Sequence, residues 1–222
     1  MKLVLFDCDG TLVDSVALIH ETMRRTFRAF EKPDPQEMAT RAIIGLTLDI
    51  AIAHMLGRDH ADEECVRMMA HYKSLFGTVR AEGFQEPLFP RVSEVLETLH
   101  AQDDVILGAV TGKSRRGLDM ICSTHGFEKL FFVSRTADDC PSKPHPAMVT
   151  ECCYQAGINP ADTVVIGDAR YDMEMAKAAG ARAIGVSWGY GSLEELKLTG
   201  ADLIAENVAE LPTLIEQVLN HA

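Results

Sequence analysis

Four aspartates stand directly behind two of the most apolar segments of the chain, Lys2–Phe6 and Thr163–Ile166. They are Asp7, Asp9, Asp168 and Asp172. Carboxylates that converge on one place repel one another unless a cation neutralises them, and oxygen ligands of this kind suit Mg²⁺. Apart from His145, no histidine stands near these positions, which disfavours zinc. The pattern therefore predicts a Mg²⁺ site.

Further polar residues follow the other apolar segments. Thr111 and Gly112 come directly after the run Val105–Val110, and Lys143 lies in the loop sequence Ser142-Lys143-Pro144. A lysine can neutralise phosphate oxygens, and a turn containing glycine can offer free backbone N–H groups to them. Together with a divalent cation, these are the groups that phosphoryl transfer requires.

The elements that position these residues can be predicted from hydrophobic periodicity. Five apolar runs have the length and continuity of strands buried on both faces: Lys2–Phe6, Val105–Val110, Leu130–Ser134, Thr163–Ile166 and Ala183–Val186. Helical patterns lie between them, as in an α/β, doubly wound (Rossmann-like) parallel sheet. Ligands of such sheets bind beyond the carboxyl ends of the strands, so the polar residues should meet there.

The segment 15–86 contains no convincing strand. Asp14 and Ser15 are typical start signals for a helix, and apolar residues then recur at helical spacing from Val16 to Phe30. Further helical patterns cover Ala42–Leu56 and Ala61–Phe76. We therefore predict a small all-helical domain of residues 15–86, inserted after the first strand of a core domain formed by residues 1–14 and 87–222.

Four motifs in order resemble those of the haloacid dehalogenase-like hydrolase superfamily. The first is Asp7-Cys8-Asp9-Gly10-Thr11, the second contains Thr111, the third Lys143, and the fourth is Gly167-Asp168 followed by Asp172. The helical insertion after the first motif, a cap in this family, is similar to that of the phosphoglycolate phosphatase-like subgroup.

This resemblance implies a role for each carboxylate. Asp7 would be the nucleophile that forms an aspartyl-phosphate, and Asp9 the acid and base that serves both half-reactions. The side chains of Asp7 and Asp168 and the backbone carbonyl of Asp9 would bind Mg²⁺. Asp172 would either bind the metal through water or orient Lys143, or it is only an acid favoured at a helix N-terminus.

The resemblance also implies where substrate binds. Thr111 and the N–H of Gly112 would hold the phosphoryl oxygens, and Lys143 would balance the charge of phosphate and nucleophile. Gly112 departs from the asparagine that phosphoglycolate phosphatases often carry there. Gly45 lies in a segment that resembles their cap loop, and Arg41 beside it could bind a substrate carboxylate or be an ordinary surface arginine.

The implied activity is a Mg²⁺-dependent phosphatase of a small phosphate monoester similar to phosphoglycolate. A β-phosphoglucomutase-like phosphomutase or a pyrophosphatase on the same scaffold is the alternative. The implied partner is a small phosphorylated metabolite, and the chain would be a monomer or a homodimer.

Composition restricts the partners further. The net charge of −12 and pI near 5.1 of the 222 residues disfavour binding to nucleic acid or to an anionic membrane surface. The apolar N-terminal run is too short for a signal peptide, and no stretch reaches the ~20 apolar residues of a membrane span. Six cysteines without CxxC spacing favour reduced thiols, so we expect a cytoplasmic protein.

Overall fold

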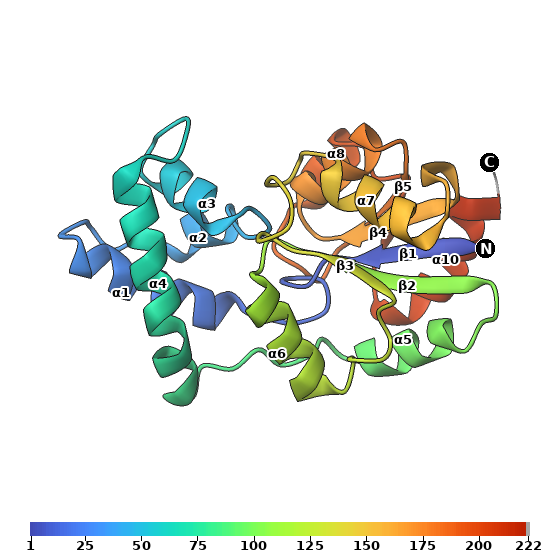
Figure 1. Cartoon of the computed structure of the whole chain (residues 1–222), viewed down its shortest axis with the longest axis horizontal. Helices are drawn as coiled ribbons and strands as arrows, with labels where there is room; N and C mark the ends of the chain where they lie inside the picture. The colour runs from blue at the N-terminus through green and yellow to red at the C-terminus, as the bar shows by residue number, and fades with distance from the viewer. Residues whose placement is uncertain (221–222) are drawn as a thin grey trace.

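The computed structural model describes residues 1–220 and places a β-sheet beside a group of helices (Figure 1). The strands are β1 (Lys2–Phe6), β2 (Val105–Val110), β3 (Val133–Arg135), β4 (Thr163–Gly167), β5 (Arg182–Val186) and β6 (Leu203–Ala205). They lie in the order β3-β2-β1-β4-β5-β6, and every neighbouring pair is parallel. The predicted doubly wound α/β fold is thus confirmed.

Two edge strands differ from the prediction. β3 begins at Val133 instead of Leu130, because Leu130 and Phe131 pack against the apolar core from the preceding loop. β6 has three residues, which is too short to stand out as an apolar run, and it was not predicted. The two central strands, β1 and β4, begin where the sequence pattern places them.

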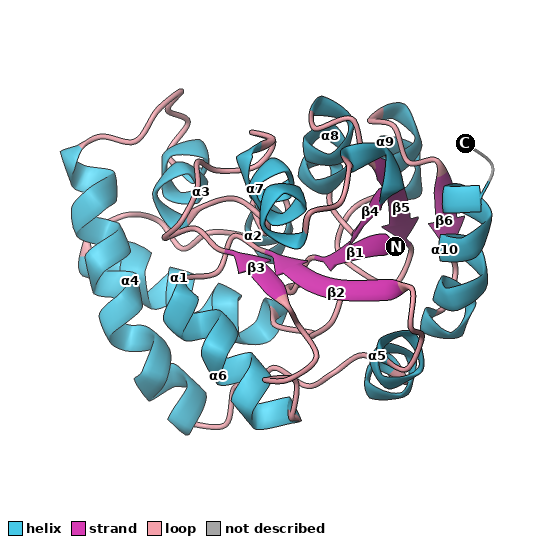
Figure 2. Ribbon diagram, turned by 45° about the vertical axis from the view of Figure 1, so that its right-hand side comes forward, coloured by secondary structure: helices cyan, strands magenta, loops and turns pink. Residues whose placement is uncertain are grey.

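Helices cover both faces of the sheet (Figure 2). Side chains of β1 alternate between the two faces, Val4 and Phe6 on one and Leu3 and Leu5 on the other. The first face packs on α5 (Val92–His100), α6 (Arg115–His125) and α10 (Leu211–Asn220); the second packs on α7 (Ala147–Ala156), α8 (Arg170–Ala178) and α9 (Leu193–Leu198). Single 3₁₀ turns span Pro160–Asp162 and Val208–Glu210. The sheet is therefore buried on both sides.

The remaining helices form a separate group beyond the carboxyl ends of the strands (Figure 1). They are α1 (Val16–Ala29), α2 (Glu37–Arg41), α3 (Leu48–Met55) and α4 (Glu63–Ala81). Their apolar faces enclose a core of their own, which includes Met23, Ile52 and Met68 and which Tyr171 of α8 joins from the sheet side. We call this group the cap. None of the helices in residues 1–220 has the length and apolarity needed to cross a membrane.

One predicted cap helix is shorter than expected. Residues 42–47 form turns, and helix α3 begins only at Leu48. Gly45 has a φ of +102°, a left-handed conformation that interrupts a right-handed helix. This non-helical segment, residues 42–47, is the cap loop.

Helix α1 begins after Ser15 as predicted, but the serine side chain does not cap it. The hydroxyl of Tyr190, from the loop after β5, instead accepts the N–H groups of Ser15 at 2.8 Å and Val16 at 3.1 Å. The same hydroxyl donates to Asp14 Oδ1 at 3.0 Å. A tyrosine of the sheet domain therefore supplies the cap of the first helix after the insertion point.

Candidate active site

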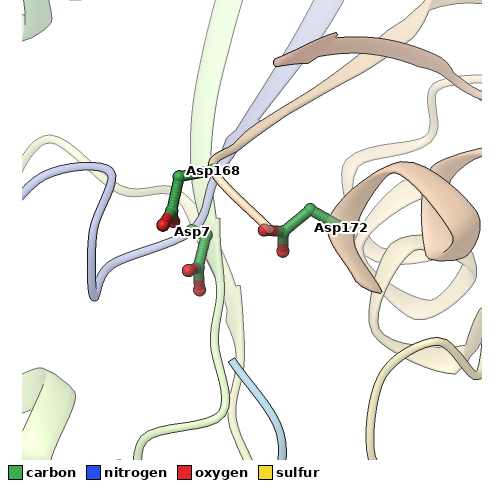
Figure 3. A group of neighbouring side chains, drawn as sticks. All are labelled: Asp7, Asp168 and Asp172. Atoms are coloured by element: carbon green, nitrogen blue, oxygen red, sulfur yellow. The ribbon is translucent and has the colours of Figure 1, made fainter. Parts of the chain in front are cut away.

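Three buried carboxylates meet at the carboxyl edge of the sheet (Figure 3). Asp7 follows β1, Asp168 follows β4, and Asp172 lies in the first turn of α8. Because β1 and β4 are hydrogen-bonded neighbours, and the Asp7 N–H continues the ladder to Ile166 O at 2.8 Å, the two strand ends coincide. Each carboxylate offers one oxygen within 4.8 Å of the others.

Lys143 links two of these acids. Its Nζ donates to Asp7 Oδ1 at 2.7 Å and to Asp172 Oδ1 at 2.6 Å, and the lysine side chain is fully buried. Burial opposes the ammonium charge, but the attraction of Asp172 and Asp7 outweighs it and raises the pKa of Lys143 above its ordinary value. Asp172 Oδ2 accepts the N–H of Ala169 at 3.0 Å, which fixes its orientation toward Lys143.

Asp168 is held by the loops on either side of it. Thr11 Oγ1 donates to its Oδ1 at 3.1 Å, and the Tyr190 N–H donates to its Oδ2 at 2.8 Å. Gly10 packs directly against this carboxylate: a Cβ at that residue would lie 2.2 Å from Asp168 Oδ2, and its φ is +85°. A glycine is therefore required in the first motif for the acid to fit.

The electrostatics of the cluster indicate a cation site. Burial raises the pKa of Asp7 to about 7, with repulsion by Asp172 adding to the effect and attraction to Lys143 opposing it. Burial, together with repulsion by Asp172 and Asp7, raises the pKa of Asp168 well above its ordinary value. Asp7 Oδ2 is buried and receives no hydrogen bond from any of residues 1–220. When ionised, the three carboxylates and one ammonium carry a net charge of −2. Oxygen ligands with this charge fit a divalent cation such as Mg²⁺.

The Asp9 side chain contacts a different lysine from the one that links Asp7 and Asp172. Lys113 donates to Asp9 Oδ1 at 2.7 Å and to Glu86 Oε1 at 2.7 Å. Burial disfavours the charge on Lys113, but its attraction to Asp9 and Glu86 outweighs that cost and raises the lysine pKa. The sequence pattern places Lys113 at a strand end without indicating a role for it, and nothing in the pattern points to Glu86.

Gly112, one of the predicted phosphate-binding residues, lies under the cap loop. Thr111 is buried, and its hydroxyl accepts the N–H of Lys113 at 3.2 Å. The cap loop covers Gly112 so closely that a Cβ there would lie 2.6 Å from the carbonyl oxygens of Gly45 and Leu46. The Thr47 N–H donates to Ser142 Oγ at 2.9 Å on the same side. The structure thus brings Gly45 and Gly112 together.

A cavity of about 1110 Å³ lies between the cap and the sheet domain. Asp9, Gly112 and Lys113 line it from the sheet side, and the cap contributes Gly45 and apolar side chains that include Ile19, Met23, Ile44, Tyr72 and Phe76. Arg41 is not among the lining residues. Its guanidinium pairs with Glu37 at 2.8 Å and lies 5.5 Å from the centre of the Tyr190 ring.

Comparison with known proteins identifies a family. Residues 4–186 match the model of the haloacid dehalogenase-like hydrolases. A phosphoglycolate phosphatase of Mannheimia succiniciproducens is 31% identical over 96% of this chain and 98% of its own, and the probable phosphatase IndB of Dickeya dadantii is 31% identical over 94% and 91%. The crystal structure of a predicted phosphoglycolate phosphatase from Haemophilus somnus 129pt superposes with a TM-score of 0.80 at 26% identity, covering 96% of this chain and 97% of that one.

Proposed function

The chain belongs to the haloacid dehalogenase-like hydrolases, and we propose that within this family it is a Mg²⁺-dependent phosphatase of a small phosphate monoester. Phosphoglycolate is the first substrate to test, because phosphoglycolate phosphatases are among its full-length relatives. We also propose that residues 15–86 form the cap domain, that residues 1–14 and 87–222 form the core domain, and that the protein is cytoplasmic.

One observation carries the proposal. Asp7 stands at the end of the central strand β1 with Oδ1 held by Lys143 and with Oδ2 buried and, among residues 1–220, without a hydrogen bond, in a cluster that carries a net charge of −2 when its acids are ionised. A structural carboxylate in that position would be expected to have both oxygens satisfied. An oxygen left free beside a cation site suits a carboxylate that binds metal and reacts with a phosphoryl group.

In the first half-reaction, Asp7 attacks phosphorus, and the bond to the leaving oxygen breaks as an aspartyl-phosphate forms. Asp9, on the cavity wall, protonates the leaving alkoxide. Thr111 and Gly112 bind the phosphoryl oxygens, and Lys143 holds the attacking carboxylate in place. When bound by Asp7, Asp168 and the Asp9 carbonyl, Mg²⁺ would supply charge neutralisation to the phosphoryl oxygens.

In the second half-reaction, Asp9 accepts a proton from water, the resulting hydroxide attacks phosphorus, and the bond between phosphorus and the Asp7 oxygen breaks. The products are inorganic phosphate and regenerated Asp7. Asp172 acts through Lys143, to which it is hydrogen-bonded at 2.6 Å, in agreement with the orienting role. Arg41 would have to break its ion pair with Glu37 before its guanidinium could bind a substrate carboxylate.

The test compares two conservative variants with p-nitrophenyl phosphate and Mg²⁺. Asp7→Asn preserves side-chain shape but removes the nucleophile, and we expect no measurable turnover with an unchanged circular dichroism spectrum. Asp104→Asn is the matched control, because Asp104 is exposed and precedes β2 at the opposite edge of the sheet. Turnover by Asp7→Asn at the rate of the control would contradict the proposed mechanism.

The substrate is tested by kcat/KM across phosphoglycolate, pyrophosphate, glucose 1-phosphate and nucleoside monophosphates. We expect phosphoglycolate to rank first. A higher kcat/KM for pyrophosphate would favour the pyrophosphatase alternative. Conversion of β-glucose 1-phosphate to glucose 6-phosphate without release of phosphate would favour the phosphomutase.

A further inference from the structure

A second buried ion cluster lies beside the three aspartates. Lys113 Nζ is 2.7 Å from Asp9 Oδ1 and 2.7 Å from Glu86 Oε1, and the three side chains are 8%, 9% and 2% exposed, respectively. They come from the end of β2, the end of β1 and the segment that returns from α4 to α5. All three line the cavity.

The contact with Lys113 determines how the Asp9 carboxylate is oriented. Within residues 1–220, Lys113 donates the only hydrogen bond that this carboxylate receives. A lysine side chain has several rotatable bonds, so one contact would not fix it. Glu86 supplies the second contact, and Lys113 is thereby held between two acids.

Glu86 is itself fixed to the sheet domain. Its backbone carbonyl lies 3.1 Å from His125 Nε2 of α6, and the carbonyl of the next residue, Pro87, accepts the Asp14 N–H at 2.8 Å. Arg80 of the cap helix α4 lies farther away, 3.9 Å from Glu86 Oε2. Glu86, the last residue of the predicted cap, is therefore hydrogen-bonded through its backbone to the domain that carries Asp9.

Stability alone does not account for this cluster. Removing three charged side chains from water costs free energy, and buried ion pairs are often no more stabilising than apolar residues of similar volume. Lys113 is also poorly suited to bind a substrate anion, since two carboxylates already share its single charge. A role of Lys113 and Glu86 in orienting the Asp9 carboxylate explains the arrangement better.

We propose that Lys113 and Glu86 are positioning residues that hold the Asp9 carboxylate in the orientation for proton transfer to the leaving oxygen. This inference rests on the proposed function, because it takes Asp9 as the general acid. Glu86 acts on Asp9 through Lys113, and neither residue exchanges a proton with the substrate.

The test uses the dependence of kcat/KM on the leaving group. Glycerol 2-phosphate releases a poorly acidic alcohol that needs protonation, whereas p-nitrophenolate leaves readily without it. General acid catalysis contributes about 10²- to 10⁴-fold, so we expect Lys113→Met to lower kcat/KM by about 100-fold for glycerol 2-phosphate and by less than about 10-fold for p-nitrophenyl phosphate. Glu86→Gln should show the same selectivity with a smaller loss, because Lys113 retains its contact with Asp9.

A double-mutant cycle with Asp9→Asn completes the design. Once Asp9 has lost its acid, Lys113→Met should lower kcat/KM for glycerol 2-phosphate no further. Lys177→Met is the matched control, since Lys177 forms its ion pair with Asp202 on the surface and should show wild-type kinetics with both substrates. If Lys113→Met fails to fold, Glu86→Gln is judged by the same two criteria.

Two results would overturn the inference. An equal loss of kcat/KM for both substrates would mean that Lys113 binds phosphate, and effects of Lys113→Met and Asp9→Asn that multiply would mean that it acts independently of Asp9. Failure of the proposed function is distinguishable, because Asp9→Asn alone would then keep wild-type kcat/KM for glycerol 2-phosphate.

Discussion

Replacing Gly112 by alanine should displace the cap loop from the active site. The added Cβ would lie 2.6 Å from the carbonyl oxygens of Gly45 and Leu46, and both are backbone atoms that cannot rotate away. Reaching a Cβ contact of 3.0 to 3.4 Å requires the loop to move by about 0.4 to 0.8 Å. Overpacking of this kind typically costs about 1–3 kcal/mol, and a misplacement of about 1 Å near reacting groups can cost about 10²-fold in rate.

We therefore expect Gly112→Ala to lower kcat/KM by about 10- to 100-fold and to lower the free energy of unfolding by about 1–3 kcal/mol. Both are measured on purified protein, the first with p-nitrophenyl phosphate and the second by urea denaturation. Gly77→Ala is the control for stability, because its Cβ would meet nothing within 4 Å and it lies inside helix α4, where alanine is favoured. Wild-type kcat/KM in Gly112→Ala would refute the idea that the cap loop rests on Gly112 during catalysis.

Three further predictions follow from the contacts of the site. Lys143→Met leaves the buried carboxylates of Asp7 and Asp172 without their shared ammonium and should lower the free energy of unfolding by about 3–5 kcal/mol in urea denaturation without metal; a loss below about 1 kcal/mol would contradict the role of the lysine. Tyr190→Phe removes the acceptor of two backbone N–H groups and should cost about 1–3 kcal/mol, whereas Tyr154→Phe, at a residue that is 92% exposed, should change stability by less than about 0.5 kcal/mol. Mg²⁺ at about 100 times its Kd should raise the Tm of the wild type by about 5–10 °C, and an equal rise in Asp168→Asn would argue against the proposed ligands.

The candidate-site residues whose proximity could be predicted from the sequence are those that directly follow strands. Asp7 and Asp168 follow long apolar runs, and the carboxyl ends of neighbouring parallel strands necessarily meet at one edge. Their mutual proximity therefore required only that the runs be recognised as strands. The fold class followed from the same runs, while the three-residue β6 carried too little signal to be seen.

Contacts between side chains of different loops could not be predicted in this way. Lys113 is 104 residues from Asp9 and 27 from Glu86, and only the folded return segment brings the three together. Tyr190 likewise caps helix α1 from 175 residues away, in place of the serine that the local pattern favours. Such partners depend on how loops from different strands pack, which periodicity does not encode.

The separate apolar core of the cap has a consequence for how this protein can diversify. Because the buried cap residues pack mainly on one another, mutations among them can reshape the cavity wall while leaving the acids at the strand ends intact. Tyr171, a buried residue of the sheet domain, takes part in the cap core. A cap transferred from a related protein would therefore need apolar side chains that pack against the Tyr171 ring. Selection for new substrates can then change the cap residues while the acids at the strand ends stay the same.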